Sequence, residues 1–215
     1  MLRLSTAIDN LYKDGQGFTD EQAKTLTEIL RQNLELADKQ ICRCFLGILG
    51  LWLLAIGIAR SVFSEVSFLS VSIKDLHSIL LVLPLAIGAL YYGLLAAVCE
   101  EAIYQFVVRE LIRHHYKKLY DNDLEDLMLL PGFLSAEIMT REHIEGCLKK
   151  IYWWWGIALV SIAVIIPLVC ITHVAYLTIA CGTGPFWLRI VGVSLSALVS
   201  LRGVVLFVTH TIIAY

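Results

Sequence analysis

The stretch VSLSALVSLRGVVLFVTH, residues 193–210, is apolar over a length that can cross a lipid bilayer, and it carries Arg202 near its middle. About 20 residues of helix span the hydrocarbon core, because the core is about 30 Å thick and each residue rises about 1.5 Å. Four segments reach that length, at residues 41–63, 79–99, 151–180 and 187–215. They predict an all-α integral membrane protein with four transmembrane helices.

The composition agrees with a membrane protein. Hydrophobic residues make up 58% of the 215 residues and charged residues 17%, whereas soluble domains average about half apolar and about a quarter charged. The net charge of −2 lacks the strong basic excess typical of nucleic-acid binding, so no nucleic-acid partner is expected. The lipid bilayer is the first partner that the composition predicts.

The placement of lysine and arginine predicts the topology. These residues concentrate in the first forty-odd positions and between the second and third spans, whereas the two opposite connections offer only Arg60, Lys74 and Arg189. By the positive-inside rule, both termini and the long central loop are expected in the cytoplasm. The polar start of the chain does not resemble a signal peptide, so the first span is expected to direct insertion.

Four regions follow from this topology. Amphipathic cytoplasmic helices are predicted for residues 1–40, and a first transmembrane hairpin for residues 41–99 with an extracytoplasmic loop at 64–78. A cytoplasmic helical loop at 100–150 and a second hairpin at 151–215 complete the fold. Thr19 and Gln22 predict a capping box at the start of a helix. The loop at 64–78 is compatible with a short strand pair or with an irregular serine-rich loop.

Small residues predict close helix packing. Spacings of three or four residues place them on one helix face, and such stripes let two backbones approach closely inside a bilayer. The fourth span carries Gly192, Ser196, Ser200 and Gly203, and the first span carries Gly47, Gly50 and Gly57. Since one four-helix bundle has fewer seams than these stripes supply, homo-oligomerisation is expected.

Arg202 is the most informative polar residue. A charged arginine at mid-membrane costs between roughly 3 and more than 10 kcal/mol, so it is expected to face protein, water or an interface. Glu100 and Glu101, at the cytoplasmic end of the second span, are its candidate ion-pair partners, with His210 near their depth. Three interpretations stay open: an interhelical ion pair, a hydrated path that favours anions or gates cations, or a contact with another membrane protein.

No catalytic or cofactor site is predicted. The chain lacks a phosphate-binding glycine loop, a nucleophile elbow and a zinc-protease motif. His77 and His173 are lone histidines on their helices, and ordinary hydrogen bonds are the expected use of each. The acidic residues Asp121, Asp123, Glu125 and Asp126 do not follow the calcium-loop pattern. They predict instead a surface for a soluble cytoplasmic partner.

These features predict two classes of function, neither of them enzymatic. The first is a small homo-oligomeric channel or pore-type protein, whose polar route includes Arg202, Glu100, Glu101 and His210. The second is a non-conducting subunit that anchors or assembles a larger complex, such as a secretion or bacterial immune assembly. Such a subunit is expected to bind its soluble partner through the cytoplasmic helices.

Overall fold

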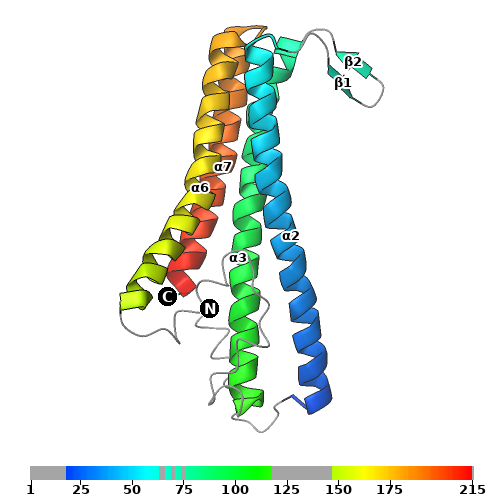
Figure 1. The fold of residues 1–215 in the computed structure, drawn as a ribbon. Coiled ribbons are helices and arrows are strands. Elements are labelled where there is room, and N and C mark those ends of the chain that lie inside the picture. The colour runs from blue at the N-terminus through cyan, green and yellow to red at the C-terminus, as the bar shows by residue number, and fades with distance from the viewer. Residues whose placement is uncertain (1–17, 63–65, 69–70, 74–75, 118–146, 215) are drawn as a thin grey trace. The chain divides into compact units, whose positions relative to one another are not determined.

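The computed structural model of the chain describes residues 18–62, 66–68, 71–73, 76–117 and 147–214 (Figure 1). Its elements, in chain order, are α2 (Asp20–Ala59), β1 (Val66–Phe68), β2 (Val71–Ile73), the 3-10 helix η1 (Leu76–Leu81), α3 (Leu83–His115), α6 (Cys147–Cys181) and α7 (Phe186–Ala214). The acidic patch predicted at residues 121–126 lies outside the described residues.

Four helices, α2, α3, α6 and α7, are long and apolar enough to cross a membrane. Each contains a segment with a mean hydropathy between 1.6 and 2.2. The 40 residues of α2 and the 33 of α3 correspond to about 60 and 50 Å of helix, well beyond the thickness of a hydrocarbon core. These two helices therefore have both apolar and polar portions, as the sequence indicated for the second span.

The helix ends differ from the predicted spans where the backbone changes conformation. The first helix ends at Ala59 rather than at residue 63, and Ser61 follows with a positive φ of 53°. The second α-helix begins at Leu83 rather than at residue 79, after η1. Pro84 lies in its first turn, where the missing amide proton removes no helical hydrogen bond.

A short hairpin is the one departure from helix among the described elements. β1 and β2 pair antiparallel, with Val66 opposite Ile73 and Phe68 opposite Val71. Of the two alternatives for residues 64–78, the strand pair is therefore the one observed. The alternation of apolar residues with serine carried this signal.

Two compact units share these helices. In the first unit, the beginning of α2 pairs antiparallel with the end of α3, around a core of Leu30, Leu34, Val108 and Ile112. Thr19 and Gln22 form the predicted capping box, because the backbone amide of each donates to the side-chain oxygen of the other, at 3.0 and 3.3 Å. This prediction is confirmed.

The apolar residues of the first unit do not all face its core. Ile29 and Leu36 are apolar residues of the segment that the sequence predicts to be amphipathic, yet 49% and 63% of their surfaces are exposed. Ala23 and Ala37 of the same helix are buried, at 0% and 5% exposure. The stripe that packs on α3 is therefore narrower than the apolar pattern in the sequence, and two large apolar side chains remain on the outside.

The second unit combines the later part of α2 and the earlier part of α3 with residues 162–206 of α6 and α7. Its core includes Ile48, Ile87, Tyr91, Leu94 and Val174. The apolar segment of α3 is 56% buried, against 17% for that of α7. Thus the apolar segment of α3 has the largest share of buried residues among the four, whereas few residues in that of α7 are fully buried.

Candidate functional site

Three small residues of α7, Gly192, Ser196 and Gly203, lie against α3 and the 3-10 helix η1 that precedes it. The Ser196 hydroxyl donates a hydrogen bond of 2.6 Å to the Pro84 carbonyl. A Cβ on Gly192 would lie 3.0 Å from the Leu81 carbonyl oxygen, and one on Gly203 would lie 3.3 Å from Tyr92 Cα. Later residues of α7 meet later residues of η1 and α3, so α3 and α7 run parallel at this seam. Close backbone approach of this kind is what small residues permit in a bilayer.

The glycines of α2 and α3 differ in how closely other residues approach them. A Cβ on Gly88 of α3 would lie 2.8 Å from Ser196 Oγ, and one on Gly47 of α2 would lie 3.0 Å from Leu90 Cδ1. Gly57 is buried. Gly50 is exposed, however, and a Cβ there would meet nothing within 4 Å. The three α2 glycines therefore do not share one packing surface within this chain.

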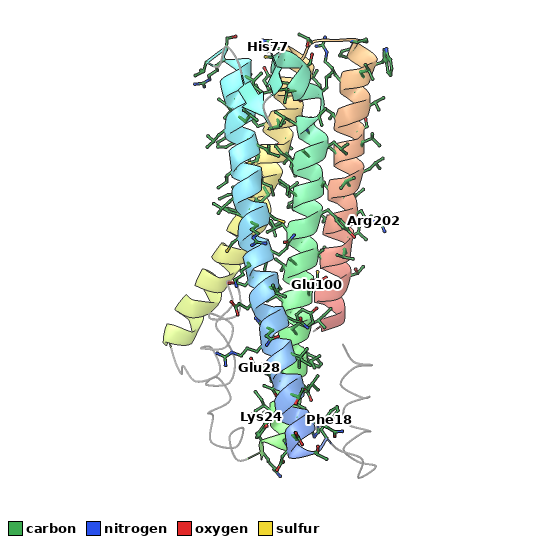
Figure 2. All side chains as sticks on the ribbon, turned by 90° about the vertical axis from the view of Figure 1, so that its right-hand side faces the viewer. Phe18, Lys24, Glu28, His77, Glu100 and Arg202 are labelled. Carbon is green, nitrogen blue, oxygen red and sulfur yellow. The ribbon has the colours of Figure 1, made fainter. Side chains whose placement is uncertain are left out.

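Arg202 lies on the outside of α7. Its side chain is exposed and points away from α3 (Figure 2). No hydrogen bond or ion pair joins it to another residue in the described part of the chain. The described residues of its own unit, 41–62, 66–68, 71–73, 76–96 and 162–206, contain no aspartate or glutamate. Among these described residues, none supplies a counter-charge to Arg202.

The two glutamates proposed as its partners face different surroundings. Glu100 is exposed (Figure 2), whereas Glu101 is buried at 1% exposure and accepts a hydrogen bond of 2.9 Å from Gln105 Nε2. Both belong to the first unit and Arg202 to the second. Only Glu100 therefore offers an exposed carboxylate. His210 lies within α7, but its side chain is outside the described residues.

The turn between α6 and α7 is held by Arg189. Its guanidinium donates to the carbonyl oxygens of Ile179, at 2.9 Å, and Gly184, at 3.0 and 3.3 Å. Carbonyls at a helix C-terminus lack intrahelical partners and interact favourably with a cation. Gly184 has a φ of +97°, which favours glycine. Arg189 thus has a structural role that its charge alone did not reveal.

Other buried polar contacts join the helices of the second unit. The Thr178 hydroxyl lies 2.8 Å from both the Leu80 and the Val174 carbonyl oxygens. Trp52 Nε1 donates to His173 Nδ1 at 3.0 Å. Neither contact can be predicted from the sequence, because the spacing of hydroxyl and indole groups along the chain does not identify a distant partner.

The candidate metal ligands are dispersed. His173 Nδ1 accepts the tryptophan hydrogen bond, so that nitrogen is already engaged. Within the described ranges, no group of three or more histidine, cysteine, aspartate or glutamate side chains is placed to hold a metal ion. The exposed position of Arg202 is therefore the polar feature of the spans that most needs an explanation.

The first unit presents a second exposed surface. A shallow groove on α2 is lined by residues that include Phe18, Gln22, Leu26 and Ile29. At the end of this unit, His115 Nε2 lies 2.9 Å from Asp20 Oδ1. The groove combines apolar and polar side chains on the outside of a helix pair.

Comparison with known proteins adds no assignment: no family model, no curated protein and no solved structure matches this chain.

Proposed function

We propose that the chain is a multi-pass membrane protein in which α2, α3, α6 and α7 cross the bilayer as two hairpins, with both termini in the cytoplasm. The length and hydropathy of the four helices support insertion. The excess of lysine and arginine in residues 1–40 and 100–150 supports the orientation. In this arrangement, residues 1–40 and 100–150 form a cytoplasmic helical layer.

Within this class, we propose that the protein acts as a homo-oligomeric channel or pore-type protein. The observation that carries the proposal is the exposure of Arg202 on α7, in a unit whose described residues contain no acidic side chain. A bare guanidinium facing lipid at this depth would be costly. Association with further copies supplies protein or water around it.

The conducting path is proposed to lie between copies. The seam between α3 and α7 is filled by close contacts of Gly88, Ser196 and Gly203, so it leaves no polar passage of its own. A path lined by the exposed side of α7 would instead bring Arg202 from each copy to the water. A ring of cations would favour anions over cations.

Flux from liposomes tests this proposal. The purified chain and its Arg202→Leu and Arg202→Lys variants are reconstituted at matched density, after their oligomeric size is checked. We expect an anion-selective flux that falls with leucine and is largely retained with lysine. Leu201→Ala, an exposed position next to Arg202, is the matched control. Absence of flux from correctly sized, folded wild-type oligomers would overturn the channel proposal.

The anchoring or assembly subunit is the second candidate, and the exposed apolar residues of the first unit favour it. Ile29 and Leu36 are exposed on α2. Ile29 also lines the groove near the start of that helix. Apolar side chains exposed on a helix are typical of docking surfaces for protein partners when they form a patch. The acidic residues 121–126 remain the other proposed surface for such a partner.

Stoichiometric co-purification tests the second candidate. A soluble partner that binds α2 should co-elute with the wild type and be lost from the Ile29→Ser, Leu36→Ser double variant. Leu46→Ser, also exposed but within the apolar segment, is the control that should leave a cytoplasmic partner bound. Retention of the partner by the double variant would exclude this surface.

A further inference from the structure

Two buried hydroxyl groups in the second unit have no hydrogen-bond partner among the described residues. They belong to Tyr91 of α3, which is 0% exposed, and to Ser200 of α7, which is 6% exposed. Most buried hydroxyl groups in native proteins are hydrogen-bonded, because a buried polar group without a partner costs free energy. Contacts between the described residues therefore leave the hydrogen-bonding capacity of this pair unused.

Tyr91 and Ser200 lie at the same level of the seam between α3 and α7. On α7, Ser200 lies between Ser196 and Gly203, which lie against residues 88 and 92 of α3. Since the two helices run parallel here, Ser200 lies at the level of the stretch between those two residues. Tyr91 belongs to that stretch, so the two buried hydroxyl groups come from neighbouring turns of adjacent helices.

Both side chains also turn to the same side of this seam. The direct contact of Ser196 with Gly88 marks where the two helices face each other. Each residue advances by about 100° around a helix axis, so Ser200 is rotated by about 40° from Ser196 around α7. Tyr91 is rotated by about 60° from Gly88 around α3, in the opposite sense. Because the two helices are parallel and face each other, opposite rotations turn both side chains to one side of the seam.

The buried face of α6 reaches the same level. Pro167 and Thr178 both belong to this face, and the Thr178 hydroxyl lies 2.8 Å from the Leu80 carbonyl oxygen. Helix α6 runs antiparallel to α3, because the short connection to α7 reverses the chain and α7 is parallel to α3. Pro167 lies 11 residues before Thr178. Tyr91 lies 11 residues after Leu80, so Pro167 is close to the level of Tyr91 and Ser200.

Pro167 provides a third polar group at this level. It lies inside the helix α6, and proline has no backbone N–H, so the carbonyl oxygen of residue 163 lacks the donor that an α-helix normally provides. A helix carbonyl points along the axis toward the residue four positions later. Because Pro167 is buried, this carbonyl oxygen is directed toward the interior of the second unit, as are the two hydroxyl groups.

We propose that α3, α6 and α7 enclose a binding site for a water molecule, held by the Tyr91 and Ser200 hydroxyl groups and by the carbonyl oxygen of residue 163. A buried water typically makes about three hydrogen bonds to polar groups that otherwise lack partners. Water both donates and accepts, so one molecule satisfies two hydroxyl groups and a carbonyl. Arg202 lies about 160° from Ser200 around α7, so this inference is independent of the proposed conducting path.

A double-mutant cycle tests the inference. Tyr91→Phe and Ser200→Ala each remove one partner of the water, so each should lower the melting temperature in detergent by about 2–4 °C. The double variant should fall by less than the sum of the two single shifts, because both residues act through one water. Ser196→Ala is the matched control: its hydroxyl bonds the Pro84 carbonyl directly, so its effect should add to that of Tyr91→Phe. Higher melting temperatures for both single variants would overturn the proposal, since removing a hydroxyl that has no partner is stabilising.

X-ray footprinting tests for the water itself and needs no variant. Radiolysis of a bound water produces a hydroxyl radical that oxidises the nearest reactive side chain, which is the ring of Tyr91. Radicals from bulk solvent do not reach a side chain that is 0% exposed. We expect oxidation of Tyr91 in the folded wild type and a several-fold decrease in Ser200→Ala. Absence of this oxidation in the wild type would overturn the proposal, and oxidation unchanged by Ser200→Ala would exclude Ser200 from the site.

Discussion

Ser196 of α7 and Gly88 of α3 pack directly against each other. The Ser196 hydroxyl reaches the Pro84 carbonyl at 2.6 Å, while its oxygen lies 2.8 Å from the place where a Cβ on Gly88 would stand. The Ser196 backbone oxygen lies only 3.1 Å from the same place. The hydrogen bond of Ser196 and the absence of a side chain on Gly88 therefore belong to the same close contact.

Gly88→Ala should therefore loosen this seam. The new methyl group would press on a short side chain and on backbone, neither of which moves easily, and overpacking of this kind typically costs about 1–3 kcal/mol. We expect that loss in the free energy of unfolding, measured by denaturant titration in mixed micelles. Gly50→Ala is the control: its Cβ would meet open space, so it should leave stability unchanged or slightly raised. Equal stability of both variants would contradict this seam.

Arg189→Leu should weaken the turn between α6 and α7. It removes hydrogen bonds from a cation to two carbonyl oxygens, and the loss should be about 1 kcal/mol because the site is partly exposed. Thermal unfolding in detergent measures it. Arg60→Leu is the control, since Arg60 is exposed and its guanidinium bonds no other residue among those described. An unchanged melting temperature for Arg189→Leu would show that the cap is dispensable.

Leu34→Ala should open the helix pair of the first unit. Leu34 is 4% exposed within its core, and truncation of a buried leucine typically costs about 2–5 kcal/mol. Hydrogen exchange should accelerate in the later part of α3, near Val108 and Ile112. Leu36→Ala removes the same atoms from a side chain that is 63% exposed and should change exchange little. Equal acceleration by the two variants would refute the packing described for this pair.

Glu35 should titrate below the ordinary range for glutamate. The hydrogen bond from Lys39 Nζ, 2.6 Å away, and then the lysine charge lower the pKa of this exposed carboxyl. Because the pKa is lowered, the pair stabilises the helix at pH values above the ordinary pKa of glutamate. This stabilisation is lost as the pH falls through the pKa of Glu35 in the folded protein. Lys39→Met should raise the pKa of Glu35, measured by carbon NMR, whereas Lys24→Met should not. No difference between these variants would exclude the pair in solution.

The sequence allowed several parts of this fold to be predicted because their causes are local. The capping box of Thr19 and Gln22 depends on residues three apart, and its predicted hydrogen bonds are present. The four apolar segments similarly depend on composition over short windows. The boundaries were less accurate: a 3-10 turn and a proline set the start of α3, and apolar composition does not distinguish these from α-helix.

Only part of the candidate site can be predicted from the sequence. Helical spacing groups Gly192, Ser196 and Gly203, but it does not identify η1 and α3 as the elements they contact. The sequence shows Arg189 as a charge outside the apolar core of the last segment, but not that it binds the end of α6. Partners distant in the chain depend on how the helices are arranged, and a one-sequence pattern does not contain that arrangement.

The sequence by itself determined that this chain forms four long apolar helices, with Arg202 well inside the last of them, because hydropathy and helical rise are properties of neighbouring residues. Only the tertiary structure decided which face of each helix is covered. It placed Ser196 and Gly203 of α7 against α3 and left Arg202 and Glu100 exposed. The physical reason is that close packing selects the face with the smallest side chains, and a charge on another face remains outside.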